Sequence, residues 1–518
     1  MRRDLTAGRA ALFAALLAVA VYFPATGNRF ALDDVQIVER NPVAHSVGAA
    51  MGAFTQPYWP AEHGVGQWRP AVILSFAVDW QLSGGSTTWL HAGNILLHAL
   101  VTALVVLFLA RYVTPIGALT GGIVFAVHPV HVEAVANLVG RAELLAAAGL
   151  LGALLLAHAV RRRRAGQAAT WPHEVGLIAC VALALLSKEH AAIAVALLWL
   201  DDQARAAQTP RLPVRDYLLV LVVTGIWLGA RQLVDRGASF GNVAPAFIQL
   251  DALGRISTML PVIFVVLRLL VWPWDLSYDY RPQVIERFEH PTLIGAFGLI
   301  VLAAFLALAL LARRQHRTVS LGLLVIFLAW LPTSNLLFPT GIVLSERTLY
   351  LSSVGLALLA ACGADALARR GRTGTTLLLA AIVALPLAAR SWTREPVWLS
   401  TRRLVLSAMA TQPESYAVRE ALARALWLRG QRQDALREYE TAAELFPLDP
   451  WLQTRLAVLD LAVGRKRDAL RHLSAVRLTD PSSLNILADV YDSLGVSDSA
   501  RAIRARVPKQ PPPLSRQQ

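Results

Sequence analysis

Long runs of apolar residues constrain this chain more than any other feature. Of its 518 residues, 55% are hydrophobic and only 16% are charged, and the mean hydropathy is +0.49. Many of the runs approach 20 residues, the length of a helix that crosses the hydrocarbon of a bilayer. A soluble chain of this length would divide into several domains with more charge. The sequence therefore predicts an all-α, polytopic membrane helical bundle with about 11–13 spans.

The expected spans together form a membrane domain of residues 1–394. They cover roughly 9–25, 89–110, 115–128, 141–160, 173–187, 189–201, 215–234, 257–274, 292–312, 319–338, 348–367 and 375–390. Residues 26–88 form the first long loop. Its segment WRPAVILSFAVDWQL is amphipathic and too polar to span. We expect it to lie as a helix along the membrane interface.

Arginine clusters set the expected orientation, because cytoplasmic loops of membrane proteins are enriched in Lys and Arg. Residues 2–3 and 161–164 are therefore placed in the cytoplasm, which leaves the first long loop outside. Twelve simple crossings cannot also place the arginines at 313–314 and 369–370 inside. We therefore expect one segment between 234 and 292 either to be re-entrant or not to be a span. We expect the inner (cytoplasmic) membrane of a bacterium, with the active site and the C-terminal region extracytoplasmic.

The net charge of +14 is consistent with this topology. Arginine-rich cytoplasmic loops that face anionic lipid account for such a charge in a membrane protein. A nucleic-acid-binding surface would show a basic stripe with interleaved aromatic residues, and the sequence has none. The composition therefore favours a membrane protein over a nucleic-acid-binding protein.

The character of the chain changes near residue 395. Gly430 and Gly464 lie 34 residues apart, each in a similar helical segment, and a weaker third copy follows. A 34-residue period with Gly at a turn and Ala in the second helix is typical of tetratricopeptide (TPR) repeats. We expect TPR-like helical repeats over 395–506, forming a short α-solenoid. Residues 507–518 are proline-rich and are expected to form a disordered tail.

An acidic pair, Asp33-Asp34, follows the first apolar run in NRFALDDVQIVERNP. Carboxylates at the mouth of a membrane span are costly unless they are used. They can bind a metal, hold a cation or deprotonate a hydroxyl, and a helix cap or a solvated loop would also explain them. The catalytic interpretation is a general base that takes a proton from a hydroxyl attacking a sugar carbon. In that interpretation a partly desolvated carboxylate beside another has a raised pKa.

Four basic residues are candidates for binding a phosphate. Arg141 is the first candidate, because a guanidinium matches phosphate oxygens. Lys188 and Arg347 lie at the ends of expected spans, and Arg69 is a weaker candidate. The structural alternatives are an Arg141–Glu143 ion pair, a solvated Lys188 and an Arg347 side chain that reaches to the membrane interface.

Other polar residues in the same loops and spans are expected to face a cavity, because polar groups in lipid usually turn inward. About half of such residues only join helices by hydrogen bonds. The His-x-x-His spacing with a nearby Glu is compatible with zinc but is common by chance. No Walker loop, GxSxG motif or cysteine-rich zinc pattern is present. The candidates are His91, Asn94, His128, His131, Glu133, Glu143, Glu189 and Glu346.

These motifs resemble those of one protein family, both in their order along the chain and in their amino-acid sequences. The segments FALDDVQIVERNP, HAGNILLHALVTALVV, VHPVHVEAVANLVGRAELLA, LLSKEHA and LPTSNLLFPTGIVLSERTLYLSSVG, followed by TPRs, are similar to the transmembrane-and-TPR O-mannosyltransferase family (TMTC). The resemblance covers most of the chain. The family in turn resembles the GT-C glycosyltransferases, which are multi-span helical enzymes with an acidic motif in the first extracytoplasmic loop.

The resemblance implies a membrane glycosyltransferase. It would transfer mannose or another hexose, with inversion, from a polyprenyl-phosphate donor to Ser or Thr of exported proteins. The family's acidic pair maps onto Asp33 and Asp34 as catalytic residues. The chain departs from the family in having far fewer TPRs, so the resemblance does not determine its acceptor. The TPRs are a candidate site for the exported protein. No cofactor is certain, and a divalent cation held by Asp33 and Asp34 is an alternative.

Two other functions fit parts of the sequence. A polyprenyl-lipid or solute transporter would explain the many spans, but transporters tend to show internal repeats and polar residues near the bilayer midplane. Here the charged clusters fall at span ends and the membrane part shows no repeat. A non-catalytic, membrane-anchored TPR scaffold would explain the C-terminal repeats, but it leaves the polar loops unexplained.

Overall fold

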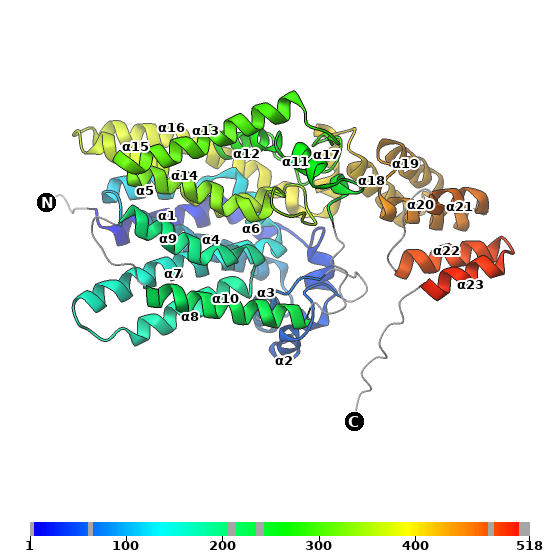
Figure 1. Cartoon of the computed structure of the whole chain (residues 1–518), viewed down its shortest axis with the longest axis horizontal. Helices are drawn as coiled ribbons and strands as arrows, with labels where there is room; N and C mark the ends of the chain where they lie inside the picture. The colour runs from blue at the N-terminus through cyan, green and yellow to red at the C-terminus, as the bar shows by residue number, and fades with distance from the viewer. Residues whose placement is uncertain (1–4, 61–65, 206–213, 235–242, 475–480, 507–518) are drawn as a thin grey trace. The chain divides into compact units, whose positions relative to one another are not determined.

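The computed structural model describes residues 5–60, 66–205, 214–234, 243–474 and 481–506 (Figure 1). These ranges are helical and contain no strand. The chain forms two compact units, each from separate stretches of sequence. Unit 1 comprises Met1–Asn242, Asp251–Tyr278 and Phe288–Leu404, and unit 2 comprises Val243–Leu250, Asp279–Arg287 and Val405–Gln518. The expected tail 507–518 and the arginines at 2–3 lie outside the described residues.

Unit 1 contains the long apolar helices. Within the described residues, seven helical segments are long and apolar enough to cross a membrane: Ala7–Gly27, Thr87–Leu109 (α4), Leu138–Ala165, Val214–Val234 (α10), Ala252–Val271, Leu293–Gln315 (α13) and Thr373–Leu399. Five α-helices lie inside the other segments: α1 (Ala7–Tyr22), α7 (Arg141–Ala165), α11 (Ala252–Met259), α12 (Val262–Val271) and α16 (Thr373–Arg394). The predicted polytopic helical bundle is confirmed.

One further apolar segment is broken in the middle. Helix α5 (Pro115–Val127) and the segment Pro129–Ala136, which contains α6 (Val132–Ala136), meet at an angle of 49°. The break follows from Pro129, because the residue before a proline avoids the helical conformation. His128 accordingly has φ −70° and ψ 125°. The bend carries the polar residues of this loop away from the axis of α5.

Several expected spans are shorter in the structure than a bilayer is thick. The segment predicted at 189–201 is a 3₁₀ turn, Glu189–Ile193, followed by α9 (Ala194–Ala204). Three other short apolar helices are α8 (Trp171–Leu185), α14 (Arg317–Trp330) and α15 (Ser352–Ala368). The predicted number of spans is reached only when the bent pair and the shorter apolar helices are counted with the seven longer ones.

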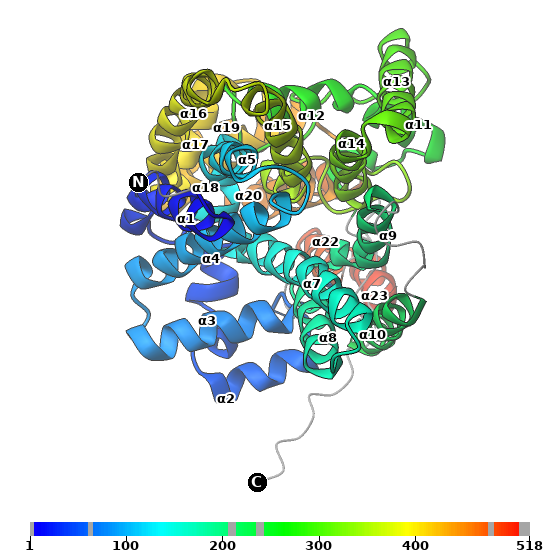
Figure 2. The same ribbon diagram turned by 90° about the vertical axis from the view of Figure 1, so that its left-hand side faces the viewer.

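Small residues bring the helices of unit 1 close together. Helix α1 packs against α4 and α5 through Ala10, Ala14 and Ala18, which are fully buried (Figure 2). Helices α14 and α15 cross where Gly322 faces Gly355, and an added Cβ at Gly355 would collide with the carbonyl oxygen of Gly322. Close backbone approach through small residues is how membrane helices gain packing energy without a hydrophobic driving force.

The first long loop is mostly ordered. It contains α2 (Val47–Ala50) and α3 (Pro70–Ser83), the latter over the segment predicted to be an interfacial helix. Arg69, the residue before α3, has φ −136° and ψ 58°, because Pro70 excludes it from the helix. The place of α3 in the membrane remains a prediction.

Unit 2 is built from consecutive helix pairs. Its helices are the end of α17 (Thr401–Thr411), then α18 (Tyr416–Leu428), α19 (Arg432–Leu445), α20 (Pro450–Ala462), α21 (Lys466–Ser474), α22 (Pro481–Ser493) and α23 (Ser497–Arg506). Gly430, Gly464 and Gly495 end three of them with φ between 77° and 83°, a conformation that favours glycine. Repeating helical hairpins are thus present, and their assignment to the TPR class remains a prediction.

Candidate active site

The structure gives the two adjacent acids different environments. The Asp34 side chain is fully buried, and its two carboxylate oxygens accept hydrogen bonds from the backbone N–H of Val139 (3.0 Å) and of Ala31 (3.3 Å). The Asp33 side chain is 39% exposed and lies 4.0 Å from the guanidinium of Arg347. Asp34 therefore joins the first loop to the segment that precedes α7, and Asp33 is the accessible carboxylate of the pair.

The backbone around the pair is held in an unusual conformation. Leu32 has φ +48°, a left-handed value that is rare for a branched residue. Its backbone N–H donates a 2.9 Å hydrogen bond to the Thr401 hydroxyl. The five residues after Asp34, Val35–Glu39, form a short π-helix. Strained backbone of this kind persists only where its surroundings hold it, and it occurs frequently at functional sites.

Arg347 is positioned by a buried glutamate from the bent segment. The Glu133 carboxylate accepts hydrogen bonds from the Ser345 hydroxyl (2.7 Å) and from the backbone N–H of Arg347 (3.0 Å). It also lies 3.6 Å from Nε of Arg347. Glu133 thus fixes the turn Glu346–Leu349 and directs its arginine toward Asp33.

Arg69 forms a two-point ion pair with Glu189. Its Nε and Nη2 donate to the two carboxylate oxygens at 3.2 and 2.9 Å. The guanidinium also lies 5.1 Å from the ring centre of Tyr58, within the range of a cation–π interaction. Burial alone raises the pKa of Glu189, but the charge and hydrogen bonds of Arg69 outweigh it and lower that pKa to about 2.

Lys188 is paired with a buried glutamate from α7. Its ammonium lies 2.8 Å from the Glu143 carboxylate, and His190 lies 3.6 Å from the other oxygen of the same group. Burial lowers the pKa of the Lys188 ammonium, and the positive charges of Arg69 and Arg347 lower it further, although Glu143 opposes them. Lys188, Arg69 and Arg347 therefore lie within electrostatic range of one another.

We call these three basic residues, Arg69, Lys188 and Arg347, the cationic cluster. The negative charge of Asp33 raises the pKa of Arg347, as does that of Glu133, after burial has lowered it. The cluster is thus assembled beside the accessible carboxylate, from the first loop, the α8–α9 turn and the turn before α15. Each of the three cations also pairs with a carboxylate, so a phosphate or diphosphate bound here would share them with Glu189, Glu143 and Glu133.

Arg141, the first phosphate candidate by sequence, is already fully engaged. Its Nη1 lies 2.6 Å from Asp79, its Nε donates to Asn94 (2.7 Å), and its Nη2 donates to the carbonyl of Leu90 (2.8 Å). The guanidinium also lies 4.3 Å from the ring centre of Phe76. Every nitrogen of the Arg141 guanidinium therefore has a partner within the protein.

The other polar candidates are buried and mostly join helices. Asn94 donates to the carbonyls of Val135, Asn137 and Leu138. His128 contacts the carbonyl of Leu270 (2.9 Å), and His131 contacts the Ser353 hydroxyl (2.7 Å).

Glu346 accepts from the backbone N–H of Ser277 at 2.6 Å. His91 is fully buried, and its ring lies near the backbone of Arg29 and the guanidinium of Arg141. In this arrangement Asn94, His128, His131 and Glu346 support the helices, as polar residues in membrane bundles often do.

Two further residues of this region, Tyr58 and Asp79, contact the candidate arginines, and no sequence pattern predicted these contacts. Tyr58 is buried under Arg69, and Asp79 neutralises Arg141. Each is a single polar residue in the first loop or in α3, with no spacing relation to its partner. The only available signal was their occurrence among apolar residues.

No group of three His, Cys, Asp or Glu side chains arranged to hold a metal ion occurs in the part of the chain that the structure describes. The Asp34 oxygens are taken by backbone N–H groups, so the pair Asp33-Asp34 does not present two free carboxylates to one cation. The residues present therefore do not fit a two-carboxylate metal site.

Comparison with curated proteins finds several relatives that are all named protein O-mannosyl-transferases. The chain is 30% identical over 496 residues to the human protein O-mannosyl-transferase TMTC1, covering 85% of this chain and 55% of the relative. It is 27% identical over 448 residues to the protein O-mannosyl-transferase F38B6.6 of Caenorhabditis elegans, covering 83% and 62%. The chain is related to the TMTC family. The chain is also 29% identical to the human protein O-mannosyl-transferase TMTC4, over 72% of its own length.

The extent of the match limits what the TMTC relatives imply. The chain spans 55–62% of the length of these three relatives. No family model matches the sequence, and no solved structure is significantly similar. The TMTC relationship and the apolar helices together identify a multi-pass membrane protein. The family resemblance inferred from the motifs is confirmed.

The buried Asp34 carboxyl should make the stability of the folded chain depend on pH. Burial raises the pKa of its carboxyl to about 7, although the hydrogen bonds from Val139 and Ala31 oppose the shift. In the unfolded chain the value is about 3.9. The folded chain therefore keeps a proton that the unfolded chain releases, so the stability from this group is full below about pH 4 and is lost as the pH rises through about 7.

We expect the thermal unfolding midpoint of the wild type, relative to that of Asp34→Asn, to fall between pH 4 and pH 7 and to level off above. Unfolding in detergent, followed by intrinsic fluorescence at several pH values, measures the difference. Parallel pH profiles of the two proteins would show that Asp34 does not titrate in this range.

Proposed function

We propose that this chain is a membrane glycosyltransferase that moves a hexosyl group, mannosyl by analogy with its relatives, from a polyprenyl-phosphate donor to a protein hydroxyl. The observation that carries the proposal is the placement of Asp33, a partly exposed carboxylate 4.0 Å from Arg347 and next to the cationic cluster. A base beside a phosphate-binding group is the arrangement that such a transfer needs. The similarity to the TMTC proteins, which are named O-mannosyl-transferases, supports it.

In the proposed reaction Asp33 takes the proton from a Ser or Thr hydroxyl. The hydroxyl oxygen attacks the anomeric carbon and forms the new glycosidic bond. The bond between that carbon and the phosphate oxygen breaks, and the polyprenyl phosphate leaves with the electron pair. Because the attack displaces the leaving group directly, the configuration at the anomeric carbon inverts.

The cationic cluster has a defined part in this reaction. Negative charge develops on the leaving phosphate, and fixed cations that face it stabilise the transition state more than the ground state. Arg347 and Lys188 are each held by a buried glutamate, Glu133 and Glu143, so their positions are set before the donor binds. Arg69 is held by Glu189 in the same way.

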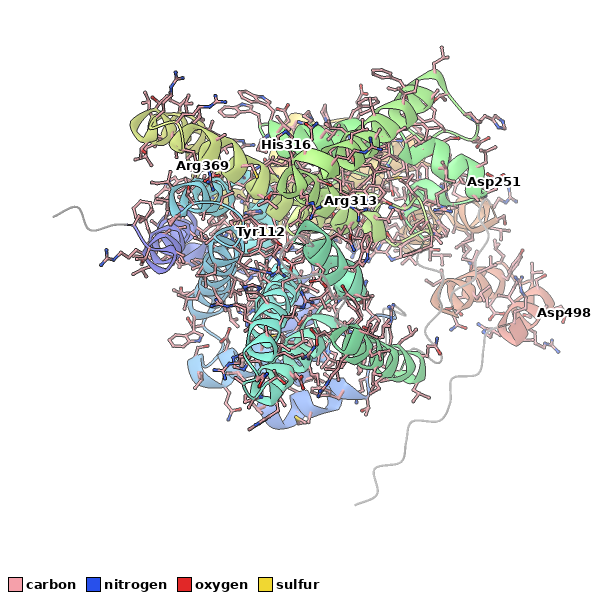
Figure 3. All side chains as sticks on the ribbon, turned by 60° about the vertical axis from the view of Figure 1, so that its left-hand side comes forward. Tyr112, Asp251, Arg313, His316, Arg369 and Asp498 are labelled. Carbon is pink, nitrogen blue, oxygen red and sulfur yellow. The ribbon has the colours of Figure 1, made fainter. Side chains whose placement is uncertain are left out.

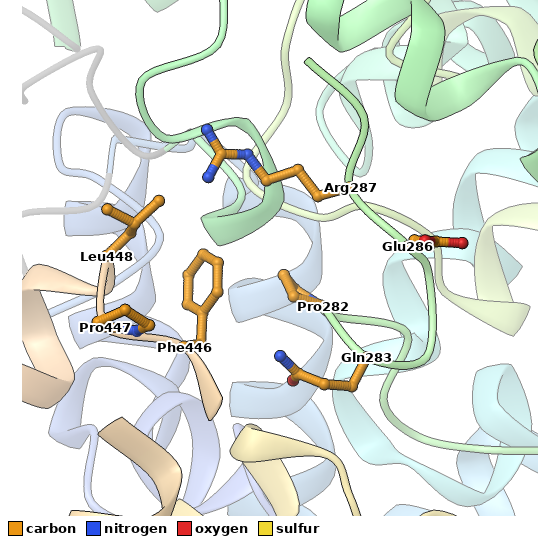
Figure 4. Close-up of a pocket in the computed structure, with 7 residues that line it drawn as sticks. All are labelled: Pro282, Gln283, Glu286, Arg287, Phe446, Pro447 and Leu448. Carbon is orange, nitrogen blue, oxygen red and sulfur yellow. The ribbon is translucent and has the colours of Figure 1, made fainter. Parts of the chain in front are cut away.

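The acceptor and the location belong to the same proposal. We infer that the site faces the extracytoplasmic side of a bacterial inner membrane, where a lipid-linked donor enters from the bilayer and an exported protein from the aqueous phase. The helical hairpins of unit 2 are the proposed contact for that protein, since stacked hairpins form concave binding surfaces. Unit 2 also contains a pocket of about 480 Å³, which lies between the segment 282–287 and the loop 446–448 (Figure 4).

The direct test uses the purified chain in proteoliposomes. Polyprenyl-phosphate mannose is supplied with a peptide that contains Ser and Thr, and the peptide mass is measured. The expected result is a gain of one hexose with the lipid-linked donor and none with a nucleotide-linked sugar. No gain with any lipid-linked hexose, together with flux of labelled lipid across the bilayer, would replace this proposal with the transporter.

The phosphate site gives a separate prediction. We expect Arg347→Gln to lower kcat/KM for the lipid-linked donor by about 10²- to 10³-fold, the range seen when one preorganised group facing a developing negative charge is removed. The matched control is Arg268→Gln, because Arg268 pairs with the exposed Asp275 and not with Glu133 or Asp33. Equal losses in the two variants would mean that Arg347 has no special role.

A further inference from the structure

Helices α9, α13 and α14 enclose a small pocket at the C-terminal end of α13. Its volume is about 110 Å³. Its polar lining consists of Gln203, Arg313, Arg317 and Ser320, and Trp199 and several leucines complete it. Figure 3 labels Arg313 and His316 at this end of the helix. The pocket lies in unit 1 and is separate from the candidate active site.

The arginines of this pocket lack acidic partners. Arg313 donates to the Gln203 side chain and lies 5.7 Å from the ring centre of Trp199. Among the described residues, no Asp or Glu pairs with Arg313 or Arg317, and no acid lines the pocket. Both arginine side chains are exposed. Uncompensated positive charge of this kind attracts an anion.

The nearest acids cannot supply the missing charge, because other arginines already hold them. Asp201, on α9, lies 2.8 Å from the guanidinium of Arg111 and also pairs with Arg205. Asp202 pairs with Arg161 and accepts from the Tyr217 hydroxyl. The pocket therefore stays net positive beside this buried charge network.

The apolar surroundings identify the kind of anion. Helix α13 is the most apolar of the candidate spans, and Leu308, Leu310 and Leu311 on its last turns are more than half exposed. Leu310 also lines the pocket, together with Leu324 of α14. A ligand that fills the pocket and also covers this face of α13 would carry both a negative head group and hydrocarbon chains. Arginine and tryptophan at the end of a membrane span also mark the level of lipid head groups.

We propose that this pocket binds the phosphodiester head group of an anionic phospholipid, with the acyl chains along the exposed face of α13. Arg313 and Arg317 contact the phosphate. The partly exposed Gln203 orients Arg313, and the leucines contact the glycerol region. Basic pockets between membrane helices are suited to anionic head groups on electrostatic grounds.

The test uses the full chain in a neutral detergent, titrated with phosphatidylglycerol or phosphatidylcholine and analysed by native mass spectrometry. We expect the Arg313→Gln/Arg317→Gln variant to bind phosphatidylglycerol about 10- to 30-fold more weakly, from roughly one arginine–lipid interaction lost per substitution. The control is Arg314→Gln, which removes one positive charge from the end of α13 but lies outside the pocket lining. It should bind phosphatidylglycerol as the wild type does.

Two further experiments distinguish binding of a lipid in the pocket from binding of a free anion. Leu324→Trp should fill the pocket and weaken phosphatidylglycerol binding without a change of charge. Inorganic phosphate at millimolar concentration should not compete, because it has no chains to contact α13. The proposal is overturned if the double variant binds as the wild type, if Arg314→Gln loses as much, if phosphatidylcholine binds equally well, or if inorganic phosphate displaces the lipid.

Discussion

Replacement of Asp33 by Asn should lower hexosyl transfer by about 10²- to 10⁴-fold, the usual contribution of a positioned general base. The amide keeps the size of the side chain but cannot take the proton from the acceptor hydroxyl. Stability should change little, because Asp33 is 39% exposed and its contact with Arg347 is 4.0 Å long. Transfer to a Ser/Thr peptide from polyprenyl-phosphate mannose, measured beside the thermal unfolding midpoint, checks both statements.

A matched control is available in the same unit. Asp275→Asn changes an aspartate whose side chain is 84% exposed and which pairs with Arg268 and not with a member of the cationic cluster. It should transfer at the wild-type rate. If Asp33→Asn retains full activity and Asp34→Asn loses it without loss of stability, the roles given to the two acids are reversed.

Replacement of Arg141 by Met should destabilise the chain by about 3–5 kcal/mol, the cost of leaving one partner of a buried ion pair alone. The change leaves Asp79 without its cation and removes the hydrogen bonds to Asn94 and to the carbonyl of Leu90. The thermal unfolding midpoint in detergent and the yield of folded protein measure the loss.

Arg347→Met provides the comparison, since it removes the same group from the candidate site. Its side chain is 14% exposed, against 2% for Arg141. Arg347→Met leaves the buried Glu133 without its cation, so we expect it to lose some stability and far more activity, whereas Arg141→Met should lose mainly stability. An Arg141→Met protein that folds normally but binds the lipid-linked donor poorly would restore Arg141 to the phosphate site, as the sequence first suggested.

The general architecture could be predicted because it depends on local patterns. The apolar runs predicted a helical membrane bundle, and the spacing of Gly430 and Gly464 predicted repeated helix pairs in the C-terminal region. Element lengths were less predictable. The segment at 189–201 is apolar enough for a span, yet its first residues form a turn that places Glu189 against Arg69.

The candidate site was less predictable because it depends on partners distant in the chain. Arg141 and Arg347 look alike in sequence, since each stands near a glutamate at the start of an apolar run. Only the fold shows that Asp79 and Asn94 bind the guanidinium of Arg141. Asp33 and its neighbour could not be distinguished either, because the burial of one of them depends on a backbone N–H more than a hundred residues away.

The discontinuous make-up of unit 2 has a consequence for how the protein is made. Two of its pieces, Val243–Leu250 and Asp279–Arg287, are synthesised well before the helices from Val405 onward with which they pack. A ribosome inserting this chain would therefore release those pieces without their partners, and they would have to wait until the final helices emerged. Expression of the C-terminal helices alone would omit part of their own core, because Ile248 packs against it.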